Sequence, residues 1–486
     1  MACNESVLEV ANTPPYDAHI PQDVTPWTGE CRDVLCDDAG APLSAITHGP
    51  MIGAITDRSV KIWVRSSLEG ELLVNVWPTS EPSEAWCSKT VPTVQELDHT
   101  AVAILSDLRP ATSYTYQISF KPFGEACAAS SAERWTFRTL PEAGQPARIR
   151  FVVGADVEDG DVPGFADIRA TAPDFVLMIG DNVYADADGF VEDYDATFER
   201  YQRLYHAVWG GRQFRDLFSR TASFMIWDDH EIMENYWAGK SDLRYAVARN
   251  LYDSYQHAHN PAPIREGELY YSFTAADIGF FVLDTRSHRD GNMEEDDVDK
   301  TMLGAEQRQA FEEWLADKTH RVHVIVSSVI FSQSTTTGAD PWRSFSVERD
   351  ALLAVLADNL TPNTFIVSGD QHWSAVLKFT HNDLDERYSL YEFQTTPLGS
   401  GERDAPNNAN ENITGLDNKH QVFGVFDIDT RQDPPLLDFT MCAVGRPCEP
   451  HTEPPPESID VDTASLPYTL FFEGGANGFE MLDGQR

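Results

Sequence analysis

The chain has 486 residues, which is long for one ordinary domain and indicates two or three. Hydrophobic residues make up 42% of the chain and aromatic residues 11%, enough for a packed core, so wholesale disorder is excluded. Its 36 Lys and Arg against 78 Asp and Glu give a formal net charge of −42, a balance that argues against binding of nucleic acids or anionic lipids. A phosphate ligand would need a local cationic centre, and bound metal is the simplest one.

Residues 1–45 are rich in Pro and Asp and lack periodicity, which predicts an irregular N-terminal leader. Cys3 follows Ala2 near the start, where a lipidated cysteine would stand after removal of a signal peptide. We therefore expect an exported protein with a lipid anchor at Cys3; the alternative is an ordinary terminal cysteine. No stretch approaches the roughly 18 consecutive apolar residues of a membrane span, so no transmembrane segment is expected.

Residues 46–140 contain short segments in which apolar and polar side chains alternate, as in half-buried strands. The apolar members fall at Val60, Ile62, Val64, Leu72, Val74, Val76, Tyr114, Tyr116, Ile118, Phe120, Trp135 and Phe137. Short strands separated by turn residues over about a hundred positions are typical of an immunoglobulin-like or fibronectin-like sandwich. A small all-β domain is therefore predicted here, followed by a linker at 140–146.

From residue 147 onward the pattern changes to apolar strands that alternate with helical stretches, which predicts an α/β domain over 147–450 and a C-terminal extension over 451–486. Six buried strands are predicted at 149–154, 175–179, 224–227, 278–283, 322–326 and 365–367. Helices are predicted at 304–318 and 347–359. Three further strands at 388–395, 422–428 and 436–441 are expected to complete a second sheet.

Six of the seven cysteines fall into plausible pairs, which are Cys31 with Cys36, Cys87 with Cys127, and Cys442 with Cys448. None of these pairs has a histidine partner at the spacing of a zinc finger. Disulfides formed in an oxidising compartment are therefore predicted, in the periplasm, the cell envelope or the extracellular space. Free buried thiols are the alternative.

Acidic residues follow four of the predicted strands at the point where each strand ends. They are Asp156, Asp181, the run Asp228-Asp229-His230-Glu231, and Asp370 with His372. One aspartate in such a place would ordinarily cap a helix. In an open α/β sheet, however, ligands bind outside the carboxyl ends of the strands, where these residues would gather. Carboxylate, imidazole and the Tyr184 phenolate together are ligands for a hard or borderline metal.

Two phrases in this order, Gly180-Asp181-x-x-Tyr184 and Trp227-Asp-Asp-His-Glu231, make the chain resemble the PhoD-type alkaline phosphatases within the calcineurin-like metallophosphoesterases. The resemblance extends from Ile46 to Thr396 and includes the segments 283–286, 303–308 and 342–349. It implies a metallophosphoesterase-type two-sheet α/β sandwich preceded by the small all-β domain. It also implies two or more metal ions, with Fe(III) accompanied by a divalent Ca, Mn, Mg or Zn ion.

The resemblance assigns roles to individual residues. Asp181 corresponds to the carboxylate that bridges two metals, and Tyr184 to the phenolate that binds ferric iron. Asp370 and His372 correspond to the closing pair of ligands. Asp229 stands at the asparagine ligand of the wider family, although Asn235 is an alternative. His230 corresponds to the histidine that interacts with the substrate and acts as general acid.

One position departs from the family pattern. PhoD-type enzymes carry a cysteine after the first strand of the catalytic domain, where this chain has Asp156. The wider superfamily has aspartate there, so Asp156 is expected to be a metal ligand. A hard oxygen ligand in place of the thiolate favours Fe(III), Mn, Mg or Ca.

Arg286 and Arg289 follow another strand end and have two alternative interpretations. Either arginine would bind a phosphate through both ends of its guanidinium, which makes Arg286 a candidate catalytic residue, or it is a salt-bridged structural residue. Asp228 and Glu231 are expected to orient their neighbours.

The leading hypothesis is an exported phosphoric ester hydrolase, an alkaline phosphatase in which a hydroxide held between two metals attacks phosphorus. The alternative with the same metal centre is a phosphodiesterase or phospholipase. A non-catalytic binding protein of the cell envelope, or a structural protein, is the alternative of another class. A non-catalytic binding protein would be expected to lack some of the metal ligands. In this sequence every expected strand end carries a candidate ligand. Oligomeric state is not predicted.

Overall fold

The computed structural model describes residues 44–189, 191–332, 340–359, 363–379, 388–403, 413–417, 419–448, 467–475 and 478–482. The predicted leader up to residue 43, which contains Cys3, Cys31 and Cys36, lies outside the described residues. So does most of the predicted extension at 451–486.

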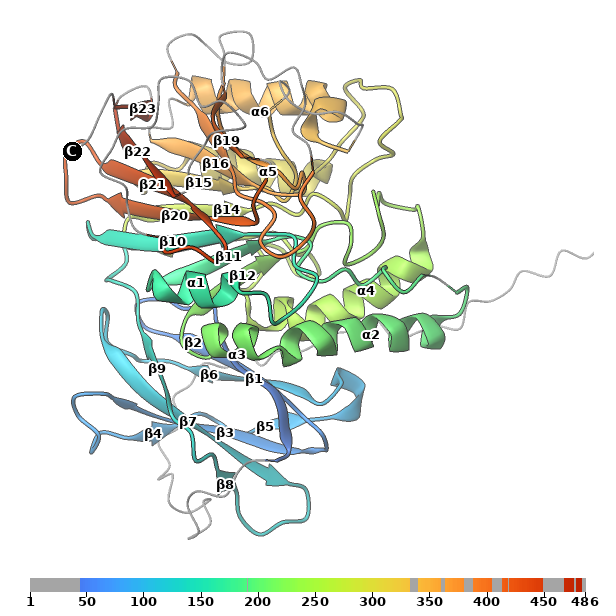
Figure 1. The fold of residues 1–486 in the computed structure, drawn as a ribbon, viewed down its shortest axis with the longest axis vertical. Coiled ribbons are helices and arrows are strands. Elements are labelled where there is room, and N and C mark those ends of the chain that lie inside the picture. The colour runs from blue at the N-terminus through green and yellow to red at the C-terminus, as the bar shows by residue number, and fades with distance from the viewer. Residues whose placement is uncertain are drawn as a thin grey trace, which may run out of the picture.

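The N-terminal region is all-β, as predicted. Its nine strands are β1 (Ile46–Gly53), β2 (Val60–Ser66), β3 (Gly70–Pro78), β4 (Trp86–Cys87), β5 (Val91–Thr93), β6 (Thr100–Leu105), β7 (Ser113–Pro122), β8 (Ala129–Ser130) and β9 (Trp135–Arg138). Strands β3, β4 and β7–β9 form one sheet together with β5, and this sheet lies at the end of the molecule opposite α5 and α6 (Figure 1). The predicted alternation holds at the start of β7, where Tyr114, Tyr116 and Ile118 are buried and the residues between them are half-buried. It fails in β2, because Trp63 is fully buried between Ile62 and Val64.

The other three N-terminal strands belong to a sheet that continues into the α/β region. Strand β1 pairs in parallel with β12, through Gly53 and Ser223. The resulting ten-stranded sheet has the order β23-β22-β21-β20-β10-β11-β12-β1-β2-β6. Its remaining members are β10 (Arg148–Gly154), β11 (Phe175–Ile179), β12 (Ala222–Ile226), β20 (Val422–Asp429), β21 (Leu436–Ala443), β22 (Tyr468–Glu473) and β23 (Glu480–Met481). The domain boundaries at 140 and 147 stay a prediction. Strands from both sides of these boundaries are hydrogen-bonded in one sheet.

A seven-stranded sheet faces the ten-stranded one, in the order β13-β14-β15-β16-β18-β17-β19. Its strands are β13 (Tyr271–Ala275), β14 (Ile278–Val282), β15 (Val322–Val326), β16 (Thr364–Ser368), β17 (Ser374–Lys378), β18 (Tyr391–Gln394) and β19 (Ile413–Asp417). Phenylalanine pairs join the sheets. Phe151 meets Phe280 edge to face with 5.3 Å between ring centroids, and Phe365 stacks on Phe426 at 5.7 Å. The predicted two-sheet α/β architecture is confirmed.

One detail of the strand prediction was wrong. Three late strands were expected to complete the second sheet, but only β18 joins it. Strands β20 and β21 extend the first sheet, because β20 pairs antiparallel with β10 along its length, from Arg148 opposite Asp429 to Val153 opposite Gly424. Apolar strands of either sheet have the same composition, so the pattern alone does not assign partners.

The helices cover the outer faces of both sheets (Figure 1). They are α1 (Gly164–Ala170), α2 (Tyr194–Gly210), α3 (Arg212–Phe218), α4 (Asp242–Tyr255), α5 (Gly304–Ala316) and α6 (Ser346–Asp358), with 3-10 turns η2 (Gln95–Leu97), η3 (His257–His259) and η4 (Trp342–Phe345). Helices α1–α4 lie beside the ten-stranded sheet and α5 and α6 beside the other. Asp193 caps α2 by accepting a hydrogen bond from the Ala196 amide. None of the described helices is both long and apolar enough to cross a membrane.

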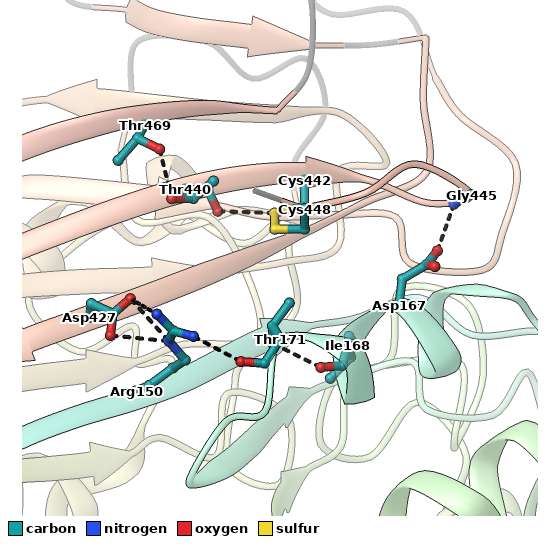
Figure 2. The surroundings of a disulfide bond; sticks show 10 residues. All are labelled: Arg150, Asp167, Ile168, Thr171, Asp427, Thr440, Cys442, Gly445, Cys448 and Thr469. Atoms are coloured by element: carbon teal, nitrogen blue, oxygen red, sulfur yellow. Dashed lines mark hydrogen bonds and ion pairs between the residues drawn. A yellow bond between two sulfur atoms is a disulfide. The ribbon is translucent and has the colours of Figure 1, made fainter. Parts of the chain in front are cut away.

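The predicted pair Cys442–Cys448 forms a disulfide, with 5.3 Å between the Cα atoms. Figure 2 shows it at the end of β21, where the turn that it closes lies against α1. The Gly445 amide donates a 2.6 Å hydrogen bond to the Asp167 carboxylate of α1, which fixes the turn. Cys87 and Cys127 are each disulfide-bonded as well.

Candidate metal centre

The carboxyl ends of β10, β11, β12 and β16 meet at one edge of the two facing sheets. Strands β10, β11 and β12 are parallel neighbours, so the residues that follow them emerge side by side. A backbone hydrogen bond from the Val157 amide to the Asp181 carbonyl (2.7 Å) joins the loops after β10 and β11. Another, from the Gly369 amide to the Ser328 carbonyl (3.1 Å), joins the loop after β16 to the one after β15. The strand ends therefore converge as the α/β pattern predicted.

The backbone at these ends is held in an uncommon conformation. Asp156, Asp181, Asp370 and His372 have φ angles of 60°, 49°, 72° and 57°, in the left-handed region that residues other than glycine adopt rarely. Gly180 has a φ of 112°, and a Cβ there would lie 2.6 Å from the Cβ of Asp228. Such conformations concentrate at functional sites, where the surrounding structure enforces them.

Three groups of side chains place potential ligand atoms within 4.8 Å of one another. They are Asp156 with Asp181 and His372, Asp181 with Asp229 and His230, and Asp181 with Asp228, Asp229 and Asp370. Asp181 belongs to all three groups. Its carboxylate is thus the side chain that the three groups have in common.

Tyr184 and His372 complete one side of the cluster. The Tyr184 hydroxyl lies 3.0 Å from His372 Nε2, which also lies 3.3 Å from Asp156 Oδ1. On the other side of the imidazole ring, Nδ1 donates to the Gly401 carbonyl at 2.5 Å. This contact fixes the ring so that Nε2 faces the cluster, as the outer partner of a metal-binding histidine does.

The donor set fits bound cations. Both oxygens of Asp156 and Oδ1 of Asp229 are buried without a hydrogen-bond partner among the described residues, which is costly for a carboxylate. Burial and then the neighbouring carboxylates raise the pKa of Asp181 and Asp370 well above the usual range. Burial, Asp156 and Asp181 likewise raise the pKa of Tyr184. Cations at this place would satisfy the orphaned oxygens and reverse these shifts.

His230 is held between two carboxylates that the sequence analysis did not single out. Its Nδ1 lies 2.9 Å from Asp186 Oδ1, and its Nε2 lies 3.1 Å from Glu234 Oε2. Burial lowers the pKa of His230, but Asp181, Asp186 and Glu234 together outweigh it, so the net shift is upward. The Glu234 amide also donates to Asp186 Oδ2 at 2.8 Å, which ties both loops together. Asp186 is two residues beyond Tyr184. This closeness to the Gly-Asp-x-x-Tyr motif is the only sequence signal that could have identified it as a site residue.

Asp186 offers a test of this arrangement. Asp186→Asn keeps the shape of the side chain but removes the charge that orients and protonates His230. We expect turnover to fall about tenfold to a hundredfold, as for other residues that orient a catalytic group, with metal content unchanged. Steady-state kinetics and elemental analysis of the same preparation check this, and loss of metal in the variant would contradict it.

Asp229 and Asn235 are in contact at the site, and both stay candidate ligands. Asp229 belongs to two of the three donor groups, whereas the Asn235 backbone amide donates to Asp229 Oδ2. The Asn235 side-chain amide donates to Glu234 Oε1 at 2.6 Å. Glu231 is fully buried and accepts hydrogen bonds from the amides of Asn182 (2.8 Å) and Asp228 (3.0 Å), so it holds two strand-end loops in place.

Arg286 is fully buried on the loop after β14, and its guanidinium is bonded to Asp228 and Asp340. Arg289 is also fully buried and donates to Asn292 Oδ1 at 2.8 Å. Of the two interpretations, this arrangement favours salt-bridged structural arginines over contact with a phosphate. His257 and His259 lie in η3 and belong to none of the three donor groups, and His259 is fully buried.

Comparison with known proteins places this site in context. A family model described as PhoD-like phosphatase matches residues 149–434, and a model for a domain of unknown function matches residues 43–133. The solved structure of PhoD is 19% identical and covers 92% of this chain and 94% of its own, with a TM-score of 0.72. Purple acid phosphatase PPD1 from yellow lupin (Lupinus luteus) seeds is 14% identical, with coverages of 82% and 72% and a TM-score of 0.61. No curated protein matches the chain.

Proposed function

Because the chain belongs to the PhoD-like phosphatase family and is a metal-dependent phosphoric ester hydrolase, we propose that it hydrolyses phosphomonoesters at a centre of two cations that share Asp181. The presence of Asp181 in all three donor groups is the observation that carries this proposal. The excess of buried carboxylate also supports it, since a −42 protein needs cations to attract a phosphate dianion.

The donor groups suggest which residues would hold each cation. Asp156, Asp181, Tyr184 and His372 surround one position, for which we propose Fe(III) because of the phenolate. Asp181, Asp229 and Asp370 surround the other, for which we propose a divalent Ca, Mn, Mg or Zn ion. When bound, such a pair supplies an activated water nucleophile and stabilises the charge that develops on the phosphoryl oxygens.

The protein's own contribution to bond cleavage comes from His230. Asp186 occupies Nδ1, and the exposed carboxylate of Glu234 lies 3.1 Å from Nε2, so a leaving group would reach Nε2 by displacing Glu234. The imidazole is only 14% exposed. The raised pKa keeps a proton on the ring, which would neutralise the departing alkoxide. The Tyr184 ring packs against the imidazole, with 4.3 Å between ring centroids, and limits its rotation.

One observation favours a second candidate, a phosphodiesterase or phospholipase with the same centre. Glu234 is 59% exposed and lies 3.1 Å from His230 Nε2, the place where a substrate oxygen would bind. A carboxylate there repels the dianion of a monoester more than the monoanion of a diester. Hydrolysis of nitrophenyl phosphate and bis-nitrophenyl phosphate on one preparation separates the candidates, and faster diester turnover would overturn the monoesterase proposal.

Metal removal tests the proposal for both candidates. Exhaustive chelation is expected to lower turnover at least about a thousandfold, since metal ions supply several kcal/mol of transition-state stabilisation. Adding back iron with a divalent ion should restore it. Elemental analysis follows the metal content throughout, and full activity in metal-free protein would contradict the proposal.

We also propose that the enzyme acts outside the cytoplasm. The disulfide Cys442–Cys448 supports this, since disulfides persist in oxidising compartments. Mass spectrometry of protein made with its native leader tests the lipid anchor, and an unmodified Cys3 would exclude it.

A further inference from the structure

Arg286 is a buried cation next to the candidate metal centre, and every one of its donors is used. Its Nε and Nη2 donate to the two oxygens of Asp228 at 2.5 and 2.8 Å. Its Nη1 and Nη2 donate to Asp340 at 3.0 and 2.7 Å, and Nη1 also reaches the Tyr236 carbonyl at 3.4 Å. A guanidinium has five N–H donors, so none remains for a substrate.

The partners of Arg286 are themselves held from other sides. Ser328 donates to Asp228 Oδ1 at 2.6 Å, and Asn292 donates to Asp340 Oδ1 at 2.9 Å. Arg289 Nη1 lies 3.5 Å from Asp340 Oδ1. Two guanidinium cations thus face two carboxylates in a closed, buried group whose charges balance.

The contacts of Arg286 give the adjacent carboxylates of Asp228 and Asp229 different surroundings. Asp228 is engaged by Arg286 and Ser328, while Oδ1 of its neighbour Asp229 lies 3.7 Å from Arg286 Nη2 without a hydrogen bond. By position alone Asp228 belongs to the donor group of Asp181, Asp229 and Asp370. Its engagement with Arg286 leaves Asp229 as the member of the pair that is free to bind a cation.

We propose that Arg286 is a positioning residue that withdraws Asp228 from the metal donor set and fixes the Asp228–Asp229 loop so that Asp229 faces Asp181 and Asp370. This inference rests on the proposed two-cation centre. Four carboxylates then remain for metal, namely Asp156, Asp181, Asp229 and Asp370. Together with the Tyr184 phenolate they carry five negative charges, which the proposed Fe(III) and divalent ion balance. Loss of Arg286 should therefore weaken the binding of the cation next to Asp229 and leave the cation beside His372 unaffected.

Titration of metal-free protein with Mn²⁺ tests the inference, with equilibrium dialysis to count bound ions. We expect wild type to bind two ions per chain. Arg286→Lys keeps the charge but not the fork that holds both aspartates, so one ion should bind normally and the second about tenfold to a hundredfold more weakly. Raising the Mn²⁺ concentration should restore turnover in this variant.

Arg289→Lys is the matched control, because it replaces a buried arginine of the same group that does not contact Asp228. It should bind both ions as wild type does. Normal binding of both ions by Arg286→Lys, or equal weakening in Arg289→Lys, would overturn the inference. Should Arg286→Lys not fold, Asp340→Asn removes one anchor of Arg286, and unchanged affinity there would also overturn it. Absence of Mn²⁺ from wild type would instead overturn the two-cation centre itself.

Discussion

Asp181→Asn is expected to abolish turnover, with a loss of at least about a thousandfold, and to remove metal from the protein. The reason is that Asp181 is common to all three donor groups, and an amide lacks the second anionic oxygen that a bridge requires. Loss of the cations removes several kcal/mol of transition-state stabilisation. Kinetics with a nitrophenyl phosphate and elemental analysis of the same sample measure both effects.

The fold should survive this substitution. Burial raises the pKa of Asp181, so its charged form opposes folding at neutral pH when metal is absent. The asparagine oxygen still accepts the hydrogen bond that the His230 amide now donates to Asp181 Oδ1 at 3.1 Å. We therefore expect metal-free Asp181→Asn to melt no lower than metal-free wild type. Asp188→Asn, at an exposed position on the same loop, is the control, and near-normal turnover in Asp181→Asn would show that the bridge lies elsewhere.

His230→Gln is expected to lower turnover about a hundredfold to ten-thousandfold for alkyl phosphates, the range of general acid catalysis. Nitrophenyl phosphate should be affected much less, because nitrophenolate leaves without a proton. The pH profile should change as well. Burial opposes the charged imidazole, but Asp181, Asp186 and Glu234 raise its pKa, so wild type keeps the proton into alkaline solution.

Bound cations would offset the contribution of Asp181 to this shift, while the contacts with Asp186 and Glu234 remain. Wild-type activity towards alkyl phosphates should therefore fall only when the pH rises through the raised pKa of His230. The pH profile of His230→Gln should lack this fall. His288→Gln is the control, since His288 has a similar carboxylate partner, Glu268 at 2.7 Å, outside the three donor groups. An equal loss for alkyl and nitrophenyl substrates would exclude His230 as the acid.

The sequence predicted that these strand ends converge because one physical rule connects them. Apolar strands such as 175–179 and 322–326 coincide with β11 and β15, and parallel strands deliver their carboxyl ends to one edge. Asp181 and Asp370 could thus be brought together although they lie far apart in the chain. The two-sheet α/β fold followed from the same pattern.

Other parts of the site depend on contacts that no local pattern encodes. Asp340 accepts a hydrogen bond from Arg286, which lies 54 residues away in the chain. No pattern in the neighbouring sequence indicates that this carboxylate is buried. Whether Arg286 would face a phosphate or a salt bridge was open in the sequence, since the answer depends on which side chains surround it after folding. The pairing of β1 with β12 likewise joins segments from two predicted domains, each of which has an ordinary composition.

Anomalous X-ray diffraction from metal-loaded crystals tests the central claim most directly, because it locates cations without reference to activity. Two peaks are expected about 3.5–4 Å apart, as in other two-metal phosphatases. Asp181 should lie between them, with Tyr184 and His372 beside one and Asp229 and Asp370 beside the other. A single peak, or peaks that Asp181 does not contact, would contradict the account.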